Sequence, residues 1–400
     1  MGRSDVRVKS IAFAVMLTLL SLSALRGWTQ SETPHSDGAT PSNTPSESST
    51  PAQLDSPPQP DPAQPNTTAV SETPASSEAP AASASPSTSG EPLHPTFFVE
   101  PLLQKGLGGV SYDLSAYSAS SGVTVLSRLE FPQISLEAGA VLGLALNRGT
   151  RREWLFEATF THSTLAMPGT MYDYDWDQPA GYPKIPFSYT YSSDSTVSWH
   201  AAIEAAYTIA ASGPWLLALY GTYRFQYTSH VEDGYTGWQY QQTGLNVFGP
   251  YTLVPEVGST PDVLEYSLTS HTIGVGLLGS LQPSPRFSVE LRSAFTPVYA
   301  FDRDDHKLRT KLSTAEGWGI GLYADLKAVY RLNRIAKGVI PYLVLNGEIN
   351  YFVVNTLQTQ YWYGNADASN GEPQGTLFTG IGHVITSSQY QIALRFGFSF

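Results

Sequence analysis

The sequence contains no cysteine. Disulfides, cysteine nucleophiles and thiolate metal sites are therefore excluded. Charged residues are scarce as well, at 14% of the chain, and their balance is acidic, with a formal net charge of -12. Because nucleic-acid binding needs a basic footprint, we expect no nucleic-acid partner. Beyond the N-terminus no unbroken apolar run is long enough for a membrane-spanning helix, so helical spans are not expected.

Two segments near the N-terminus lack the residues of a folded core. A basic start with Arg3, Arg7 and Lys9 precedes the apolar run IAFAVMLTLLSLSAL, which predicts a signal peptide over residues 1–30. Residues 31–95 contain no lysine, arginine or aromatic residue and are rich in proline, serine and threonine. Such a segment cannot bury enough apolar surface to offset its loss of chain entropy, so we predict a disordered tether there.

From about residue 96 onward, apolar and polar residues alternate with a period of two. In the last segment, YQIALRFGFSF, large apolar side chains fall on one face of an extended chain and small or polar ones on the other. The segment WLLALYGTYRFQYTSH (215–230) shows the same pattern. Together with the 23 tyrosines of the chain, this alternation indicates β-strands with an aromatic, lipid-facing side.

Short and long connections alternate along this region. Short turn signals occur at 147–150, 211–214, 283–286 and 333–338, and long polar stretches at 168–185, 229–262, 302–310 and 357–380. We therefore predict an all-β fold over residues 96–400, a transmembrane antiparallel β-barrel that projects beyond the outer membrane. Its ten predicted strands start near residues 107, 122, 152, 186, 214, 262, 286, 310, 338 and 382. A large soluble all-β protein is the alternative to this interpretation.

Acidic residues gather in two of the long polar stretches. MYDYDWDQ (171–178) falls in the predicted loop after the third strand, and its Asp173 and Asp175 project from one face if the chain is extended. In the seventh strand, RFSVELRSAFTPVYAFDRDDH, the inward register continues by twos to Asp302, Asp304 and His306. Because strands three and seven are expected on roughly opposing walls, both sets should meet at one rim, facing the barrel axis.

An acidic cleft with one imidazole can activate water. A carboxylate at Asp304 orients the ring of His306, whose ordinary pKa of about 6.5 lets it take a proton near neutral pH. Asp173 and Asp175 can hold a water between themselves and that ring. The expected chemistry is peptide-bond hydrolysis without a covalent intermediate, with the remaining carboxylates attracting cationic substrates.

At these residues the sequence resembles the omptin family of outer-membrane endopeptidases. DYDW (173–176) and DRDDH (302–306) are similar to that family's two catalytic signatures in order, separation and strand context. The resemblance implies that the catalytic residues are Asp173, Asp175, Asp304 and His306. It also implies that Asp302 binds substrate and receives a basic side chain next to the cleaved bond. A second acidic position of that substrate pocket falls near Leu114 in this sequence.

The resemblance also implies location, partners and cofactors. The cleft is expected to face outward from the outer membrane of a Gram-negative-type bacterium, with extracellular peptides or proteins as substrates and membrane lipid around the barrel. It implies no cofactor and admits lipopolysaccharide as an activator, but the family's basic lipid-binding residues have no clear match, since TYRFQY (222–227) offers only Arg224. No metal is expected, because no HExxH spacing occurs. No oligomeric state is predicted.

Other interpretations remain open from the sequence alone. The aspartates of DYDW also fit a solvated acidic loop or a calcium site. The barrel also fits a non-catalytic adhesin or a binding protein for cationic ligands. A passive pore is a third function, although a barrel of about ten strands is narrow enough for side chains to fill.

Overall fold

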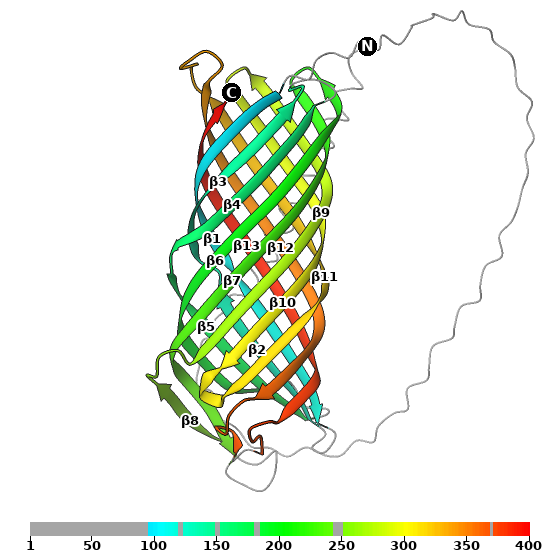
Figure 1. The fold of residues 1–400 in the computed structure, drawn as a ribbon. Helices are drawn as coiled ribbons and strands as arrows, with labels where there is room; N and C mark the ends of the chain where they lie inside the picture. Colours follow the sequence, from blue (N-terminus) through cyan, green and yellow to red (C-terminus); the bar gives the residue numbers. More distant parts are fainter. Residues whose placement is uncertain (1–94, 119–122, 149–152, 180–184, 243–250, 369–370) are drawn as a thin grey trace, which may run out of the picture. The chain divides into compact units, whose positions relative to one another are not determined.

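A closed antiparallel sheet contains almost every residue that the computed structural model describes, namely 95–118, 123–148, 153–179, 185–242, 251–368 and 371–400 (Figure 1). The predicted signal peptide lies outside these residues, as does the predicted tether (31–95) except for its last residue, Pro95, which begins the first strand. A ring of ten hydrogen-bonded strands forms the wall, in which β2 with β3 makes one barrel strand and β4 with β5 another. The ring closes where β1 pairs with β13. The predicted closed barrel of ten antiparallel strands is therefore confirmed.

The strands, in chain order, are β1 (Pro95–Ser118), β2 (Val123–Pro132), β3 (Ser135–Leu146), β4 (Trp154–Leu165), β5 (Met167–Pro179), β6 (Ile185–Ser212), β7 (Trp215–Gln242), β8 (Tyr251–Gly258), β9 (Leu264–Ser284), β10 (Phe287–His306), β11 (Lys311–Arg331), β12 (Ile340–Trp362) and β13 (Leu377–Ser399). The short strand β8 lies outside the ring and pairs only with β7. One turn of 3-10 helix, η1 (Lys307–Arg309), connects β10 to β11. In the described part of the chain, no helix has the length and apolarity to cross a membrane.

Tight turns gather at the end of the barrel that holds the C-terminus, which we call the turn end; the opposite end is the loop end (Figure 1). Three of the four short turns are confirmed: the connection from β6 to β7 needs only Gly213 and Pro214, that from β9 to β10 only Pro285 and Arg286, and residues 332–339 join β11 to β12. The fourth, at 147–150, lies partly outside the described residues.

The predicted long loops are wrong in extent, because much of each is strand. MYDYDWDQ lies within β5 rather than in a loop, β7 continues to Gln242, and β10 runs through His306. Beyond the lipid zone a strand needs no outward apolar side chains, so its sequence becomes as polar as that of a loop. The start of the first strand, predicted near residue 107, is also wrong: β1 begins at Pro95 and includes the glycine-rich segment KGLGG.

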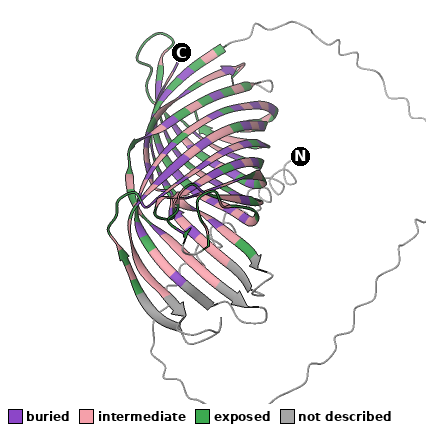
Figure 2. Ribbon diagram, turned by 60° about the horizontal axis from the view of Figure 1, so that its bottom comes forward, coloured by how far each residue is buried: buried purple, intermediate pink, exposed green. Residues whose placement is uncertain are grey.

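Outward-facing side chains define an uncharged zone around the barrel, called the lipid zone because its height matches that of a bilayer core. Along β11, the outward residues from Trp318 to Tyr330 are uncharged, and Glu316 faces outward directly beyond Trp318. The thirteen residues from Trp318 to Tyr330, in a strand tilted by roughly 45°, span about 28 Å, close to the thickness of a bilayer core. On β10 the outward Arg303 and Asp305 lie beyond this zone, toward the loop end. The alternation of buried and exposed residues runs along the strands in Figure 2.

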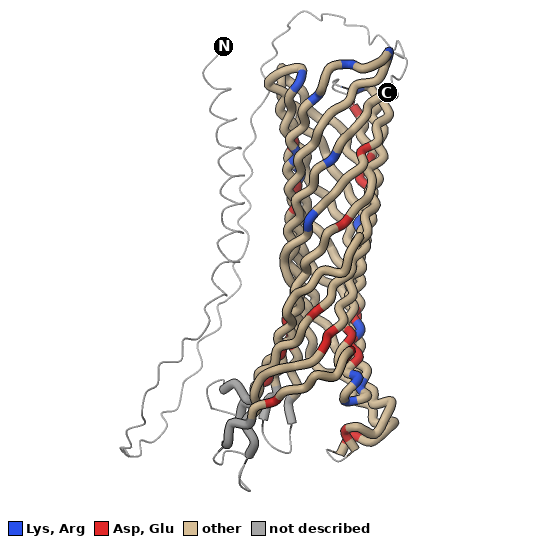
Figure 3. Tube along the Cα trace, turned by 90° about the vertical axis from the view of Figure 1, so that its left-hand side faces the viewer, with Lys and Arg blue, Asp and Glu red and all other residues tan. Residues whose placement is uncertain are grey.

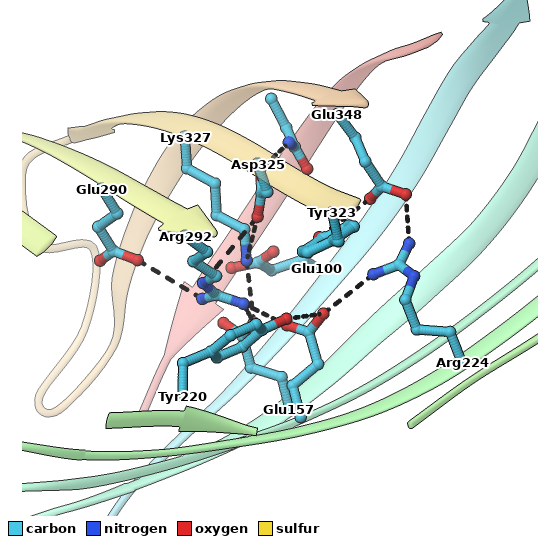
Figure 4. Close-up of polar contacts among 12 residues, drawn as sticks. Glu100, Glu157, Tyr220, Arg224, Glu290, Arg292, Tyr323, Asp325, Lys327 and Glu348 are labelled. Atoms are coloured by element: carbon cyan, nitrogen blue, oxygen red, sulfur yellow. Dashed lines mark hydrogen bonds and ion pairs between the residues drawn. The ribbon is translucent and has the colours of Figure 1, made fainter. Parts of the chain in front are cut away.

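Charged side chains bond one another in the lumen, inside the part of the barrel with uncharged outward residues (Figure 4). Arg292, which is 1% exposed, bonds the carboxylates of Glu157 and Glu204, and Lys327 Nζ lies 2.9 Å from Glu157 Oε2. Arg224 bonds Glu204 on one side and Glu348 on the other. Buried charges are stable only when paired in this way. A cavity of about 540 Å³ opens between this network and the turn end.

An apolar plug lies in the lumen toward the loop end. Its buried residues come from β1, β2, β5, β9, β10, β12 and β13 and from the residue just before β9: Val110, Tyr112, Leu129, Phe131, Met171, Val263, Leu264, Tyr266, Leu268, Val298, Ala300, Phe352, Val354 and Ile385. The rings of Phe131 and Tyr266, from opposite walls, stack with centroids 4.3 Å apart. The plug therefore forms a floor beneath the rim at which the acidic residues lie.

Candidate active site

The inward register of β10 brings three predicted site residues to the loop end. Even-numbered residues of this strand face the lumen, and Asp302 and Asp304 are each 2% exposed. His306, the last residue of the strand, is partly accessible, with a side chain that is 17% exposed. The sequence prediction that these three residues share the inner face is consistent with this arrangement. Acidic residues, with a few basic ones, gather toward this end in Figure 3.

Asp304 and His306 form a hydrogen-bonded pair. His306 Nε2 lies 2.9 Å from Asp304 Oδ2. An ionised carboxylate can only accept, so Nε2 carries the hydrogen and Nδ1 is left with a lone pair. The hydroxyl of Tyr112, from β1, donates a second hydrogen bond to the same Oδ2 atom. The carboxylate thereby fixes the ring of His306 and is itself fixed by Tyr112.

Asp173 and Asp175 lie on the inner face of β5, the loop-end half of the third barrel strand. Asp175 Oδ2 accepts a hydrogen bond of 2.8 Å from Ser188 on the neighbouring β6. On the outer face the rings of Tyr172, Tyr174 and Trp176 stack, with successive centroids 6.4 and 5.7 Å apart. The alternation of aspartate and aromatic residues in MYDYDWDQ is thus a strand pattern, with carboxylates inside and a stacked aromatic surface outside.

The two acidic pairs belong to one electrostatic cluster. Burial raises the pKa of Asp173 well above its usual range, and the charges of Asp175 and Asp304 raise it further, while Lys311 opposes them. One oxygen of Asp173 and one of Asp304, Oδ1 in both, are buried with no hydrogen-bond partner among the described residues. Buried polar atoms are normally bonded, so this is a place that favours a polar guest such as water.

The protonation states in the cluster suit general-base chemistry. Burial alone would raise the pKa of Asp304, but His306, Lys311 and the Tyr112 hydroxyl together hold it below its usual value. Burial lowers the pKa of His306, and the cations of Lys311 and Arg309 add to that effect against the opposing charge of Asp304. At neutral pH the site therefore holds an ionised Asp304 and a neutral imidazole, which is the form of histidine that accepts a proton, and the raised pKa of Asp173 favours the protonated form of that residue.

Asp302 lies two residues before Asp304 on β10, deeper in the lumen than the Asp304–His306 pair. Its Oδ2 atom accepts a hydrogen bond of 2.8 Å from His383 Nε2, and the hydroxyl of Tyr266 lies 3.4 Å away. Burial raises the pKa of Asp302, and the bond to His383 counteracts part of that effect. The residue predicted to bind substrate thus faces the lumen beneath the pair, where an imidazole of the same chain engages it. Its substrate-binding role stays a prediction.

Comparison with known proteins shows which fold this barrel resembles. No protein-family model matches the chain, and no curated protein matches it either. Among solved structures, the outer membrane protease OmpT from Escherichia coli aligns with 76% of this chain and 96% of its own, at a TM-score of 0.54 and 14% identity. The barrel is omptin-like. At this identity the likeness concerns the fold alone. Two structures of OmpT from Vibrio cholerae, at 9% identity and TM-scores of 0.09 and 0.11, carry no argument.

Three further residues contact or border the site of this omptin-like barrel and could not be identified from the sequence pattern. Lys311, 5% exposed, lies directly opposite His306 in the β10–β11 pairing, and its inward direction follows from that register alone. Tyr112 and His383 come from β1 and β13, and their partners on β10 are 192 and 81 residues away in the sequence. No local pattern marks them. Among the described residues, no group of three or more His, Asp or Glu side chains is placed to hold a metal ion.

Proposed function

We propose that the protein is an outer-membrane endopeptidase that hydrolyses extracellular polypeptides with an activated water. The observation that supports this most strongly is the His306–Asp304 hydrogen bond of 2.9 Å, in a cluster with the raised pKa of Asp173, beyond the lipid zone of the barrel. The fold shared with the outer membrane protease OmpT supports the same function and location. The plug beneath the site and the charged network in the lumen argue against a passive pore.

In the proposed reaction, Asp173 and Asp175 hold a water against the Nδ1 atom of His306. The water oxygen attacks the carbonyl carbon as its proton moves to Nδ1, and Asp304 stabilises the resulting imidazolium. The protonated Asp173 donates toward the carbonyl oxygen as negative charge develops there. His306 then returns the proton to the leaving amine as the C–N bond breaks. No covalent intermediate forms.

The cleft faces the cell exterior in this proposal, because it lies at the loop end of the barrel, opposite the turn end at which β1 begins and β13 ends. The carboxylates of Asp175 and Asp304 give the cleft an attraction for cationic polypeptides. Asp302 is assigned to the wall of the pocket that receives the side chain next to the cleaved bond. Lipopolysaccharide as an activator and surrounding lipid as a partner remain part of the proposal.

The test compares neighbouring residues of the same motif. Asp304→Asn and His306→Ala should each lower kcat for a quenched fluorescent peptide by roughly a thousandfold or more. The matched control is Asp305→Asn, since Asp305 lies between them but bonds Arg303 and Tyr363 on the outer wall, and it should cleave normally. All proteins are refolded in detergent with lipopolysaccharide. Wild-type activity in either site variant would refute the assignment.

Two further readouts separate this function from a non-catalytic binding barrel. Cleavage in water labelled with heavy oxygen should place one label in the new carboxyl group of the product, as direct attack by water requires. A binding protein for cationic ligands would retain the peptide without turnover, and wild-type protein would then give no product in mass spectrometry.

A further inference from the structure

A second acid–imidazole pair lies directly beneath the first. Asp302 precedes Asp304 by two residues on the inner face of β10, and its carboxylate bonds His383 from β13. The ring of Tyr112 lies 5.0 Å from the ring of His383, while its hydroxyl bonds Asp304. The lower pair is more deeply buried than the upper one, with His383 1% and Asp302 2% exposed.

The lower pair, Asp302 and His383, has hydrogen-bond partners within the protein itself. His383 Nε2 donates to Asp302, and its Nδ1 lies 3.4 Å from the side-chain amide nitrogen of Gln358, which donates to it. These two bonds fit a neutral ring beside an ionised carboxylate. Asp302 accepts in addition from the backbone N–H of Ala315 and faces the hydroxyl of Tyr266. The carboxylate directly beneath the catalytic pair is therefore occupied by partners of its own chain, and a cation from outside would have to displace one of them.

The neighbours of the lower pair on β1, β9 and β12 are uncharged. Leu114 lies opposite His383 in the β1–β13 pairing and packs against the plug, and Tyr112 and Tyr266 complete the surroundings of the pair. A lysine or arginine side chain entering here would have to replace His383 at Asp302 and would leave the imidazole buried without its acceptor. Leaving one buried partner unsatisfied costs roughly a tenfold to hundredfold loss in binding.

We propose that His383 is a specificity-determining residue, which screens Asp302 so that the pocket next to the catalytic pair accepts neutral rather than basic side chains. This inference rests on the proposed protease function and refines its substrate class. The acidic cleft above still attracts cationic polypeptides, but the side chain next to the cleaved bond is selected by a neutral pocket. Removing the imidazole exposes the Asp302 carboxylate and creates room for a cation beside it.

The experiment measures kcat/KM for two peptides that differ only in the residue before the cleaved bond, leucine or arginine. Wild-type protein should cleave the leucine peptide at least as well as the arginine peptide. His383→Ala should raise kcat/KM for the arginine peptide by roughly tenfold or more and change that for the leucine peptide little. Adding Asp302→Asn to His383→Ala should abolish the gain, because the receptor carboxylate is gone. His383→Gln, which retains a donor to Asp302, should keep the wild-type preference.

Two results would overturn the inference: a wild-type preference for arginine that Asp302→Asn removes, or a His383→Ala protein whose preference equals that of the wild type. Should His383→Ala fail to fold, His383→Ser takes its place and should show the same gain for the arginine peptide, which adding Asp302→Asn should again abolish. Activity on the leucine peptide tests the protease function separately. If no peptide is cleaved, the proposed function fails; the affinity of each protein for a fluorescent arginine peptide then still shows whether His383 screens Asp302.

Discussion

Lys311 lies directly opposite His306 where β10 turns into β11, and both side chains point into the lumen. Directly paired residues of an antiparallel sheet have Cβ atoms about 5 Å apart, so an ammonium group borders the proposed general base. Among the described residues, Lys311 makes no ion pair within 4.0 Å. Its charge instead acts on the whole cluster, lowering the pKa of His306 and of Asp304.

Lys311→Met should shift the acid limb of the kcat/KM profile to higher pH. The reaction requires a neutral His306. Burial is the largest effect that lowers the pKa of His306; the positive charge of Lys311 lowers it further, and the negative charge of Asp304 opposes both. Removing the cation raises that pKa. On acidification, activity should therefore be lost at a pH roughly one unit higher than in the wild type. Kinetic profiles from about pH 4 to about pH 9, which bracket the titration range of a histidine, measure the shift.

Lys307→Met is the matched control for that measurement. Lys307 lies four residues away but bonds Asp262 at 2.5 Å and Glu265 at 3.4 Å on the outside. Its removal should leave the acid limb in place. An identical profile for Lys311→Met and the wild type would mean that Lys311 does not act on His306.

Tyr112→Phe should weaken catalysis while leaving the barrel folded. The hydroxyl supplies a hydrogen bond to the buried Asp304 carboxylate, whereas the ring packs in the plug and is retained by phenylalanine. Losing a hydrogen bond to a buried charge costs about 1.5 to 3 kcal/mol, so kcat/KM should fall roughly ten- to a hundredfold. Tyr363→Phe, which loses a bond to the outward Asp305, should not change it. Equal kinetics for both variants would count against a positioning role.

The contrast between local and long-range information explains what the sequence could predict. Alternation and turn residues are local, so the ten strands, the starts of most of them and the inward register of Asp302, Asp304 and His306 could be predicted. Strand extent beyond the lipid zone could not, because polar residues suit both a loop and a strand that faces water. The bonds from Tyr112 to Asp304 and from His383 to Asp302 depend on how β1 and β13 are staggered against β10 around the ring, which no segment encodes alone.

Gly108 is the position in β1 where barrel closure is most sensitive to a side chain. A Cβ there would lie 2.1 Å from the backbone oxygen of Ser388 on β13, and the φ angle of 135° is one that other residues rarely adopt. Gly108→Ala should therefore force β1 and β13 apart and lower stability by roughly 2 kcal/mol or more. Gly347→Ala on β12 is the control, since no atom lies within 4 Å of the point that an alanine Cβ would occupy there. Urea unfolding followed by tryptophan fluorescence compares the two, and equal midpoints would contradict the prediction.

Asp173 should set the alkaline limit of activity. Burial and the neighbouring Asp175 charge raise the pKa of Asp173 well above its usual range, so the residue keeps its proton to a higher pH than an ordinary aspartate does and loses it as the pH rises further. If the protonated form assists the reaction, activity falls through that pKa. Asp173→Asn cannot ionise, so it should keep part of the activity and lose the alkaline fall. Asp175→Asn removes a negative charge that raises the pKa of Asp173. The pKa of Asp173 should then be lower, so the activity of this variant should decline at a lower pH than that of the wild type. Profiles in which both variants keep the wild-type alkaline limb would show that the proton on Asp173 takes no part in the reaction.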